Sequence, residues 1–203
     1  MENFLAECLE RYPMLECCRN DILKSCDLLE NAFKNGKKLL LCGNGGSASD
    51  CGHIAGELLK SFKCKRLIAG EFRHSVGDAI ADNLQGALAA ISLPDMVAIN
   101  TAYANDCDST YNFAQLVYGL GFPGDILLGL STSGNAKNVN LAATVARAKG
   151  MAVVGMTGKS GGNLAGKCDA CIRVPESETF KVQELHLPVY HTLCLSLEQR
   201  FFG

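Results

Sequence analysis

An apolar run that ends in a glycine-rich turn constrains this chain more than any other segment. Residues 39–42 have the composition of a buried strand, residues 43–46 supply the turn, and Ser47 is of a type that often opens a helix. Such a turn directs backbone N–H groups and a helix N-terminus at one point, which suits an anion such as phosphate. A plain turn with a helix cap would explain the glycines and Ser47, but it would not explain Asn44.

A second unit of the same kind lies further along the chain. Residues 125–130 form another apolar run, and a polar turn follows it. This turn consists of Ser131, Thr132, Ser133, Gly134 and Asn135. Two strand–turn–helix units, both rich in small hydroxyl and amide groups, indicate one small phosphorylated ligand that is held from two sides.

Apolar runs of strand length alternate with helical segments along most of the chain. This alternation predicts an α/β fold with a five-stranded parallel sheet that is covered by helices on both faces. Ligands of such sheets gather at the carboxyl ends of the strands, near the switch in strand order, and both polar turns fall at such ends. The five runs are 38–42, 87–92, 125–130, 151–157 and 170–174.

Composition limits the classes of function. Apolar residues make up 48% of the 203 residues, which excludes a disordered chain and allows one domain with a sizeable core. The net charge of −2 indicates no basic surface, so we expect no nucleic-acid partner. No apolar run is long enough to span a membrane, and residues 1–4 open an acidic amphipathic segment that does not resemble a secretion signal. We therefore expect a cytoplasmic protein with no membrane partner.

The eleven cysteines are expected to be reduced, mostly core residues, because nothing marks the chain for secretion. Cys168 and Cys171 have the C-x-x-C spacing, but no second pair of this kind accompanies them. We therefore favour packing over a zinc or redox role for these two residues.

The two ends of the chain are expected to be helical. Residues 1–36 form an N-terminal helical segment that ends at Asn35-Gly36, and residues 178–202 form a strongly apolar last helix. Pro188 lies inside this last helix, where it removes one hydrogen bond and predicts a kink. Residues 66–86 are hard to place, although residues 77–88 allow a helix.

Two nucleotide-binding motifs match only in part. Gly43, Gly45 and Ala48 fit G-x-G-x-x-A, but the next clear strand ends far downstream at Ser92, so the acidic residue of a dinucleotide site is not where it should be. The end of a P-loop is present at residues 157–160, but Val153 stands where the leading glycine is required.

Titratable residues gather in two segments. His53 and Glu57 are four residues apart on the helix that starts at Ser47, so they share a face. Gln183, Glu184, His186 and His191 lie in the otherwise apolar last helix. Imidazole, carboxylate and amide groups of this kind can bind a divalent ion such as zinc. Ordinary hydrogen bonds between polar groups remain the alternative on spacing alone.

Taken together, these motifs resemble those of the sedoheptulose 7-phosphate isomerases (phosphoheptose isomerases), which are sugar isomerase (SIS) domain proteins. The resemblance runs from about residue 20 to the C-terminus and keeps the order of the family's motifs. The motifs are Gly43-Asn44-Gly45-Gly46-Ser47, His53, Glu57, Asn105-Asp106, Ser131-Thr132-Ser133-Gly134-Asn135, Gln183-Glu184-Leu185-His186 and His191. The resemblance implies a flavodoxin-like three-layer sandwich, with residues 1–203 as a single SIS domain, and a homotetramer with sites at subunit contacts.

The resemblance also implies roles for individual residues. Glu57 and His191 match the acid/base pair of an aldose–ketose isomerase that converts sedoheptulose 7-phosphate to D-glycero-D-manno-heptose 7-phosphate through an enediol. The positions that match zinc ligands in some members are His53, Glu57, Gln183 and His191. The positions that match substrate-binding residues are Asn44, Gly45, Gly46, Ser47, Asn105, Asp106, Ser131, Thr132, Ser133 and Gln183. We assign Glu57 as the carbon base and His191 as the acid/base on oxygen.

Three features depart from the family pattern. Ala136 stands where the family often has a serine, which removes one contact worth about 1 kcal/mol. Pro188 lies between Gln183 and His191 and affects their relative placement. Residues 66–86 look like an insertion that could form a lid or reshape the sugar pocket. Two alternatives therefore stay open: an isomerase for another ketose phosphate, or a non-catalytic SIS protein that binds a sugar phosphate or acts as a scaffold.

Overall fold

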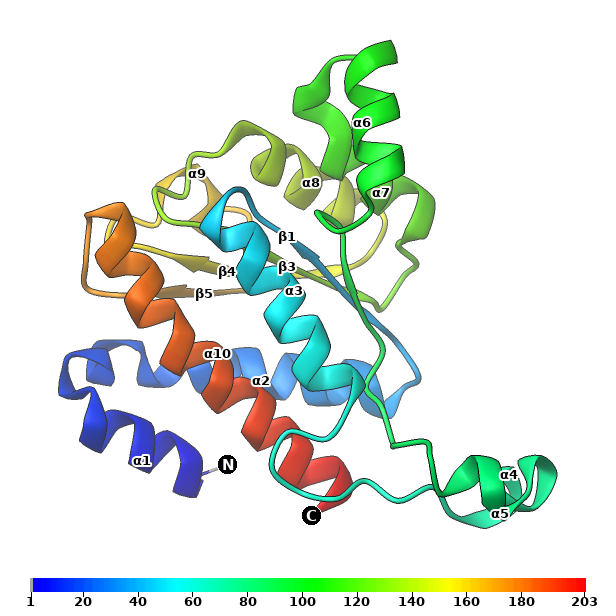
Figure 1. Ribbon diagram of the computed structural model, residues 1–203. Coiled ribbons are helices and arrows are strands. Elements are labelled where there is room, and N and C mark those ends of the chain that lie inside the picture. The colour runs from blue at the N-terminus through cyan, green and yellow to red at the C-terminus, as the bar shows by residue number, and fades with distance from the viewer. Residues whose placement is uncertain (1) are drawn as a thin grey trace.

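The computed structural model describes residues 2–203 and contains one five-stranded parallel sheet (Figure 1). The strand order is β2-β1-β3-β4-β5, which is the order of flavodoxin-like folds. All five runs expected to be strands are confirmed. The strands are β1 (Leu39–Cys42), β2 (Ala90–Ser92), β3 (Ile126–Ser131), β4 (Ala152–Thr157) and β5 (Ala170–Arg173).

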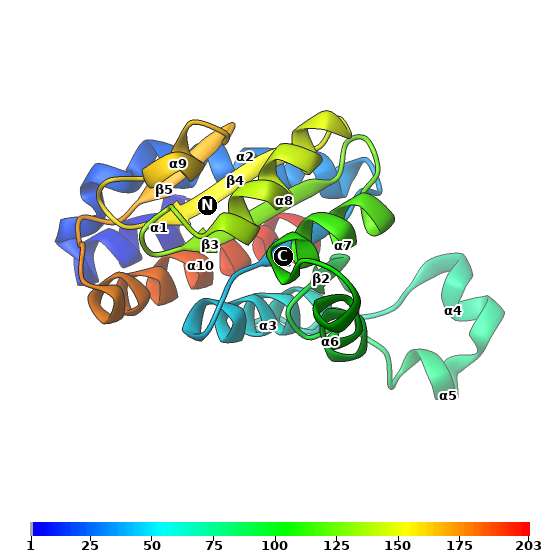
Figure 2. The ribbon, with the colours of Figure 1, turned by 90° about the horizontal axis from the view of Figure 1, so that it is seen from above.

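Helices cover both faces of the sheet, so the predicted three-layer sandwich is confirmed (Figures 1 and 2). One face is covered by α2 (Arg19–Lys34), α3 (Gly46–Leu59) and α10 (Thr179–Phe202), and α1 (Glu2–Arg11) packs on α10. The other face is covered by α7 (Asn112–Leu120), α8 (Lys137–Ala148) and the short α9 (Gly162–Ala165).

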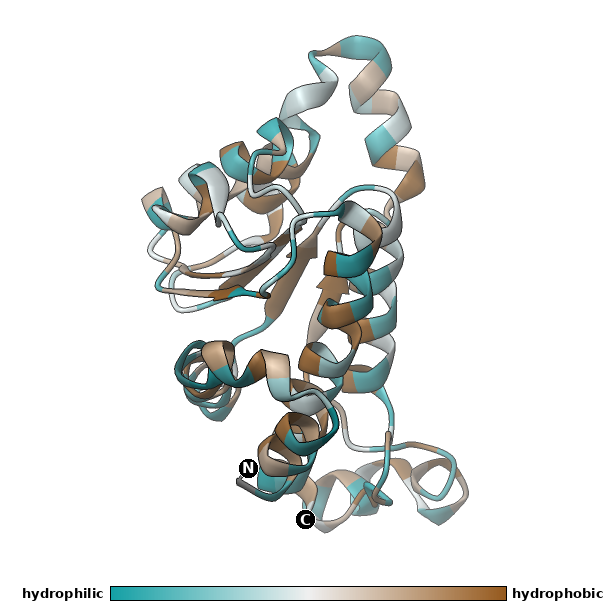
Figure 3. Ribbon diagram, turned by 90° about the vertical axis from the view of Figure 1, so that its left-hand side faces the viewer, coloured by the Kyte–Doolittle hydropathy of each residue, from teal (hydrophilic) through white to brown (hydrophobic). Residues whose placement is uncertain are grey.

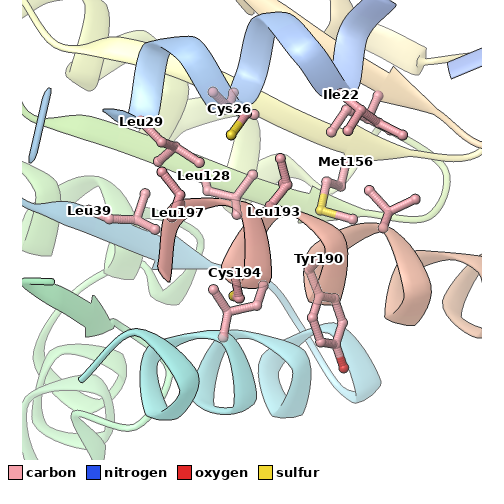
Figure 4. Close-up of a cluster of buried hydrophobic side chains, with 14 of the residues drawn as sticks. Ile22, Cys26, Leu29, Leu39, Leu128, Met156, Tyr190, Leu193, Cys194 and Leu197 are labelled. Carbon is pink, nitrogen blue, oxygen red and sulfur yellow. The ribbon is translucent and has the colours of Figure 1, made fainter. Parts of the chain in front are cut away.

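Successive side chains of each strand point to opposite faces of the sheet, and this alternation produces one core on each face. Leu39 and Leu41 pack against α2, α3 and α10, whereas Leu40 and Cys42 pack against α7 and α8. The strands therefore supply apolar residues to both cores, and Figure 3 shows the brown colour of apolar residues along the sheet. Figure 4 shows the first core, which joins α2, α10 and the sheet through Cys26, Leu193 and their neighbours.

The N-terminal segment is helical as expected, but it is not one helix. Helix α1 ends at Arg11, a 3-10 helix η1 (Pro13–Cys18) follows, and α2 begins at Arg19. Pro13 has no N–H group and is therefore tolerated in a first turn but not inside a helix, which explains the break. The last helix, in contrast, runs for 24 residues through Pro188.

The segment expected to be an insertion extends from the body of the molecule (Figures 1 and 2). It contains α4 (Gly70–Val76) and the single turn α5 (Asp78–Ala81), so the helix allowed over residues 77–88 covers only the start of that range. Gly77 separates the two helices with a φ of +82°, a conformation that favours glycine.

Helix α6 (Val97–Asp106) also projects from the body (Figure 1), and none of its residues is buried. The 3-10 helix η2 (Ser109–Tyr111) connects it to α7. Among residues 2–203, no helix has both the length and the apolar character needed to cross a membrane. All eleven cysteines are free thiols in the structure.

Candidate active site

Both polar turns line one cavity of about 340 Å³. They follow β1 and β3, which are hydrogen-bonded neighbours at the point where the strand order reverses. Helix α10 closes the cavity with Thr179 and Gln183. The turn residues that line it are Asn44, Gly45, Gly46, Ser47, Ser131, Thr132 and Ser133. The structure therefore brings together the two turns that the sequence predicted to share one ligand.

Close packing and backbone conformation favour glycine in the first turn. A Cβ on Gly46 would lie 2.6 Å from Nε2 of Gln183, and a Cβ on Gly43 would lie 2.8 Å from the backbone oxygen of Ser47. Gly45 has a φ of +55°, which side chains rarely tolerate. The turn is thus compact, and the Gln183 side chain packs directly on it.

The cavity offers hydrogen-bond donors to an anion. Helix α3 is 14 residues long, and its N-terminal N–H groups and dipole favour negative charge. The Ser131 Oγ accepts from the Ala136 N–H at 3.3 Å, and the Ser133 Oγ accepts from the Asn135 N–H at 3.1 Å. Each hydroxyl therefore keeps its own proton for a ligand oxygen.

Among the described residues, those that line this cavity carry no charged side chain. The groups that this chain offers to a phosphate here are thus N–H and O–H groups rather than a lysine or an arginine. Ala136 lines the same cavity, so the hydroxyl that a serine would add there is missing.

Glu57 and His191 come from different helices and meet through His53. The His53 Nε2 lies 3.3 Å from the Glu57 Oε1 and 3.5 Å from the His191 Nε2. The Glu57 Oε2 also accepts from Lys60 Nζ at 3.1 Å. Burial, together with the adjacent His53, lowers the pKa of His191, although Glu57 partly opposes this. A neutral His191 beside a carboxylate is an arrangement suited to proton transfer.

Two residues that sequence reasoning missed lie behind His53. The Tyr190 hydroxyl is 3.0 Å from the His53 Nδ1 and donates to the Asp50 Oδ1 at 3.2 Å. Burial is the main cause of the raised pKa of the Asp50 carboxyl. In the sequence, Tyr190 looks like an ordinary core residue of α10, and Asp50 belongs to no motif. Only their contact in the folded chain identifies them.

The remaining wall beside His191 comes from the segment that follows α3. The Phe62 ring centroid lies 5.3 Å from that of His191. His191 also opens onto a second cavity of about 330 Å³, which is lined by α1, Lys63 and α10. Residues 62 and 63, which precede the expected insertion, therefore shape the surroundings of His191. Helices α4 and α5 extend away from the body of the molecule (Figure 2).

Gln183 lies with the polar turns rather than with the imidazoles. Its side chain packs on Gly46, and it precedes His191 by eight residues, or about 12 Å of helix. This position supports a role in substrate binding better than a role as a metal ligand beside His53.

Asn105 and Asp106 lie in the last turn of α6, which projects from the body of the chain. The Asn105 amide donates to the Asp106 carboxylate at 2.9 Å, and both side chains are exposed. Within one chain, these two side chains thus pair with each other.

An amide network that sequence reasoning missed links the first turn to α6. Asn44 and Asn138 exchange two hydrogen bonds of 2.9 Å. Asn138 donates to Asn112 at 3.4 Å, and Asn112 donates to Asn100 of α6 at 3.0 Å. The network holds Asn44 against α8, a contact that no local motif signals.

The imidazoles and Glu57 fit a zinc ion only in part. Four ligands at about 2.0–2.1 Å from zinc lie roughly 3.3–3.4 Å from one another, and the two separations at His53 are 3.3 and 3.5 Å. Among the described residues, however, no three His, Cys, Asp or Glu side chains form a complete group around one point. Zinc at this place would require side-chain adjustment, for example release of Glu57 from Lys60.

Comparison with protein families and curated proteins agrees with these features. Residues 101–196 match the model of the SIS domain. The phosphoheptose isomerase of a Nitratiruptor species is 40% identical over 170 residues, which are 84% of this chain and 81% of the relative. That of a Roseiflexus species is 42% identical over 170 residues, which are 84% of this chain and 77% of the relative.

Two solved structures extend the similarity to the whole fold. The phosphoheptose isomerase GmhA from Neisseria gonorrhoeae is 29% identical with a TM-score of 0.77, over 96% of this chain and 95% of that chain. A phosphoheptose isomerase from Francisella tularensis is 29% identical with a TM-score of 0.79, over 98% of this chain and 96% of that chain. With its strand order, its paired polar turns and these relatives, the chain belongs to the phosphoheptose isomerase family of SIS-domain proteins.

Proposed function

We propose that this protein is an aldose–ketose isomerase that converts sedoheptulose 7-phosphate to D-glycero-D-manno-heptose 7-phosphate. The phosphate binds in the cavity between the two polar turns, and C1 and C2 of the sugar reach Glu57 and His191. Family membership supports this function, since the relatives named above are phosphoheptose isomerases.

The spacing between the two ends of the site carries the proposal. Along α3, six residues or about 9 Å of helix rise separate Ser47 from His53, and the His53 ring contacts both Glu57 and His191. Along α10, eight residues or about 12 Å separate Gln183 from His191. An extended seven-carbon chain with its phosphate spans roughly 10 Å, given carbon–carbon bonds of about 1.5 Å. A heptose phosphate therefore matches this spacing, whereas shorter ketose phosphates reach less far.

Two positioned groups supply the proton transfers. Glu57 removes a proton from C1, which gives an enediol, and the proton returns to C2 to complete the aldose. His191 moves a proton between the oxygens of C1 and C2. Each positioned acid or base is worth roughly 10²–10⁴-fold in rate.

We also propose that His53, His191 and Glu57 would hold a zinc ion. When bound, the ion would stabilise negative charge on the sugar oxygens as a Lewis acid. Glu57 cannot be a tight ligand and a free base at the same time, so it would bind the metal weakly or alternate between the two roles.

We further propose that the active unit is a homotetramer in the cytoplasm. Asn105 and Asp106 project on an exposed helix, so they would line a site only in a neighbouring copy of the chain. Eleven free thiols are compatible with a reducing compartment.

The experiment is a panel of ketose phosphates with five to seven carbons, with proton exchange at C1 and aldose formation as readouts. We expect turnover to be fastest with sedoheptulose 7-phosphate. The Glu57→Gln variant should lose about 10²–10⁴-fold in kcat while it keeps its affinity for inorganic phosphate. Elemental analysis of the purified protein determines its zinc content.

Glu71→Gln is the matched control, because Glu71 is exposed on α4 and the same chemical change there should leave turnover intact. Normal turnover in Glu57→Gln would refute the assignment of the base. Phosphate binding without isomerisation of any ketose phosphate would favour a non-catalytic SIS protein instead.

A further inference from the structure

A buried tyrosine and an aspartate stand in line behind His53. Tyr190 is 1% exposed, and its hydroxyl points from α10 toward α3 (Figure 4). The hydroxyl oxygen lies 3.2 Å from the Asp50 Oδ1 and 3.0 Å from the His53 Nδ1. The Tyr190 and His53 rings meet edge-on, at a centroid distance of 5.4 Å and an angle of 73°. Three side chains thus form one hydrogen-bonded row.

The number of protons in this row fixes its direction. A phenol has one proton, and while Asp50 is ionised its carboxylate can only accept. The Tyr190 hydroxyl donates to Asp50, so its oxygen can only accept from His53. The donor in the second contact must then be the His53 Nδ1–H.

We propose that Asp50 and Tyr190 are positioning residues that hold a proton on the Nδ1 of His53, so that Nε2 is the working atom of this imidazole. The inference rests on the proposed function, because it assigns the inner support of the same site. It holds for a neutral and for a charged His53, since Nδ1 carries a proton in both forms.

The contacts of the His53 Nε2 explain why the position of the proton on this ring matters. The Nε2 faces the Glu57 Oε1 at 3.3 Å and the His191 Nε2 at 3.5 Å. With Nδ1 protonated, the Nε2 of the neutral ring carries a lone pair that can accept a proton or bind a cation. The opposite tautomer would fix a proton on Nε2 and leave no lone pair there.

Simple packing does not account for the two residues. A phenylalanine would fill the same space without bringing a hydroxyl into the core, and the second carboxylate oxygen of Asp50 is buried with no hydrogen-bond partner. Burying an unsatisfied polar atom costs about 1–3 kcal/mol. Outer partners of a functional histidine commonly set its tautomer and ring orientation in this way.

The test measures the tautomer directly. Two-bond ¹H–¹⁵N spectra of the histidine-labelled protein distinguish Nδ1–H from Nε2–H, and the chain has only 4 histidines to assign. We expect His53 to carry its proton on Nδ1 in the wild-type protein at a pH where the ring is neutral. Tyr190→Phe should reduce the Nδ1–H population and lower kcat about 10- to 100-fold with little change in KM.

Asp50→Asn is the second variant, since it removes the charge that orients the Tyr190 proton. It should weaken the preference of His53 for a proton on Nδ1. Tyr118→Phe is the control, because it removes a hydroxyl from an exposed tyrosine on α7. A proton on Nε2 in the wild-type protein, or an unchanged tautomer in Tyr190→Phe, would overturn the proposal. Absence of isomerase activity in the wild-type protein would instead count against the proposed function, because the spectra do not depend on turnover.

Discussion

His186 shows how one buried side chain can make the stability of this fold depend on pH. Its side chain is fully buried in α10, and neither ring nitrogen makes a hydrogen bond of normal geometry. Burial lowers the pKa of His186 to about 4 from an ordinary value of 6.5, while the nearby Thr157 backbone acts weakly in the other direction. The folded protein therefore keeps this imidazole neutral in mildly acidic solution.

The sign of the effect on folding follows from proton uptake. Between pH 6.5 and 4 the unfolded chain binds a proton at His186 and the folded chain does not. As the pH falls from 6.5 to 4, the free energy of unfolding should therefore decrease, and His186 should account for roughly 3 kcal/mol of this decrease. His186→Leu should remove this contribution, as measured by chemical denaturation at pH 7 and pH 4.

His74→Leu provides the comparison, since His74 is exposed on α4 and should leave the pH dependence unchanged. Carboxylates also titrate in this range, so the informative quantity is the difference between variant and wild type. Parallel curves for His186→Leu and the wild-type protein would contradict the expected burial of a neutral ring.

At the same scale, sequence reasoning identified residues that carry a local signal. The glycines and hydroxyl groups of the two turns follow apolar runs directly, and His53 and Glu57 share a helix face by spacing alone. Tyr190 and Asp50 gave no such signal, because their contact joins residues 140 positions apart. A phenol in an apolar helix resembles a core residue until its partner is seen.

Among the elements, the pairing of α3 with α10 determines the geometry of the site. Helix α3 carries Glu57, and α10 carries His191. An ion pair between Arg66, which follows α3, and Glu198 of α10 joins the two helices a second time. The Arg66 Nε donates to the Glu198 Oε1 at 2.9 Å, and the two side chains are 0% and 2% exposed. Arg66 also donates to the backbone oxygens of Glu57 at 2.9 Å and Leu58 at 2.7 Å.

Glu198 organises the loop after α3 from the other side of this ion pair. Its carboxylate accepts from the backbone N–H groups of Phe62, Lys63 and Cys64. Burial acts to raise the pKa of Glu198, but these donors and Arg66 outweigh it, so the pKa is lowered. The ion pair therefore fixes both the end of α3 and the loop that packs on His191.

Arg66→Met should destabilise the protein strongly, since it leaves a buried carboxylate without its charged partner. We expect a loss of about 3–5 kcal/mol in the free energy of unfolding, measured by chemical denaturation. Arg73→Met is the matched control in the same segment. Arg73 pairs with the exposed Asp78 and Asp82, and such pairs are worth about 1 kcal/mol or less. Equal losses in the two variants would show that the Arg66 ion pair does not stabilise the contact between α3 and α10.

The strands were predictable, whereas the structure of residues 66–86 was not. Each strand is a short apolar run bounded by turn residues, and burial on both faces makes that pattern unambiguous. Residues 77–88 also have helical composition, but only Asp78–Ala81 is helical, and the chain after it returns to the body. There, the Leu88 N–H donates to the Leu58 oxygen at 2.9 Å, a tertiary contact that overrides local propensity.

At the scale of the whole molecule, Asn105 and Asp106 lie apart from the residues that line the cavity. The two polar turns share a cavity with Gln183, and the His53 cluster lies further along the same two helices. Asn105 and Asp106 remain outside, on a helix with no buried residue. Val97 and Ile99 of that helix are 65% and 39% exposed. Apolar side chains on a projecting helix are typical of a surface that another chain covers.

We therefore expect a homotetramer in solution, with a mass about four times the 21.6 kDa of one chain, as measured by light scattering after size-exclusion chromatography. Ile99→Glu should shift the protein toward smaller species and lower kcat, because a charge on α6 would have to be buried in the interface. Thr144→Glu adds the same charge to an exposed position of α8 and should change neither property. A fully active monomer would contradict the expectation, because Asn105 and Asp106 could then play no part in a site completed by a neighbouring chain.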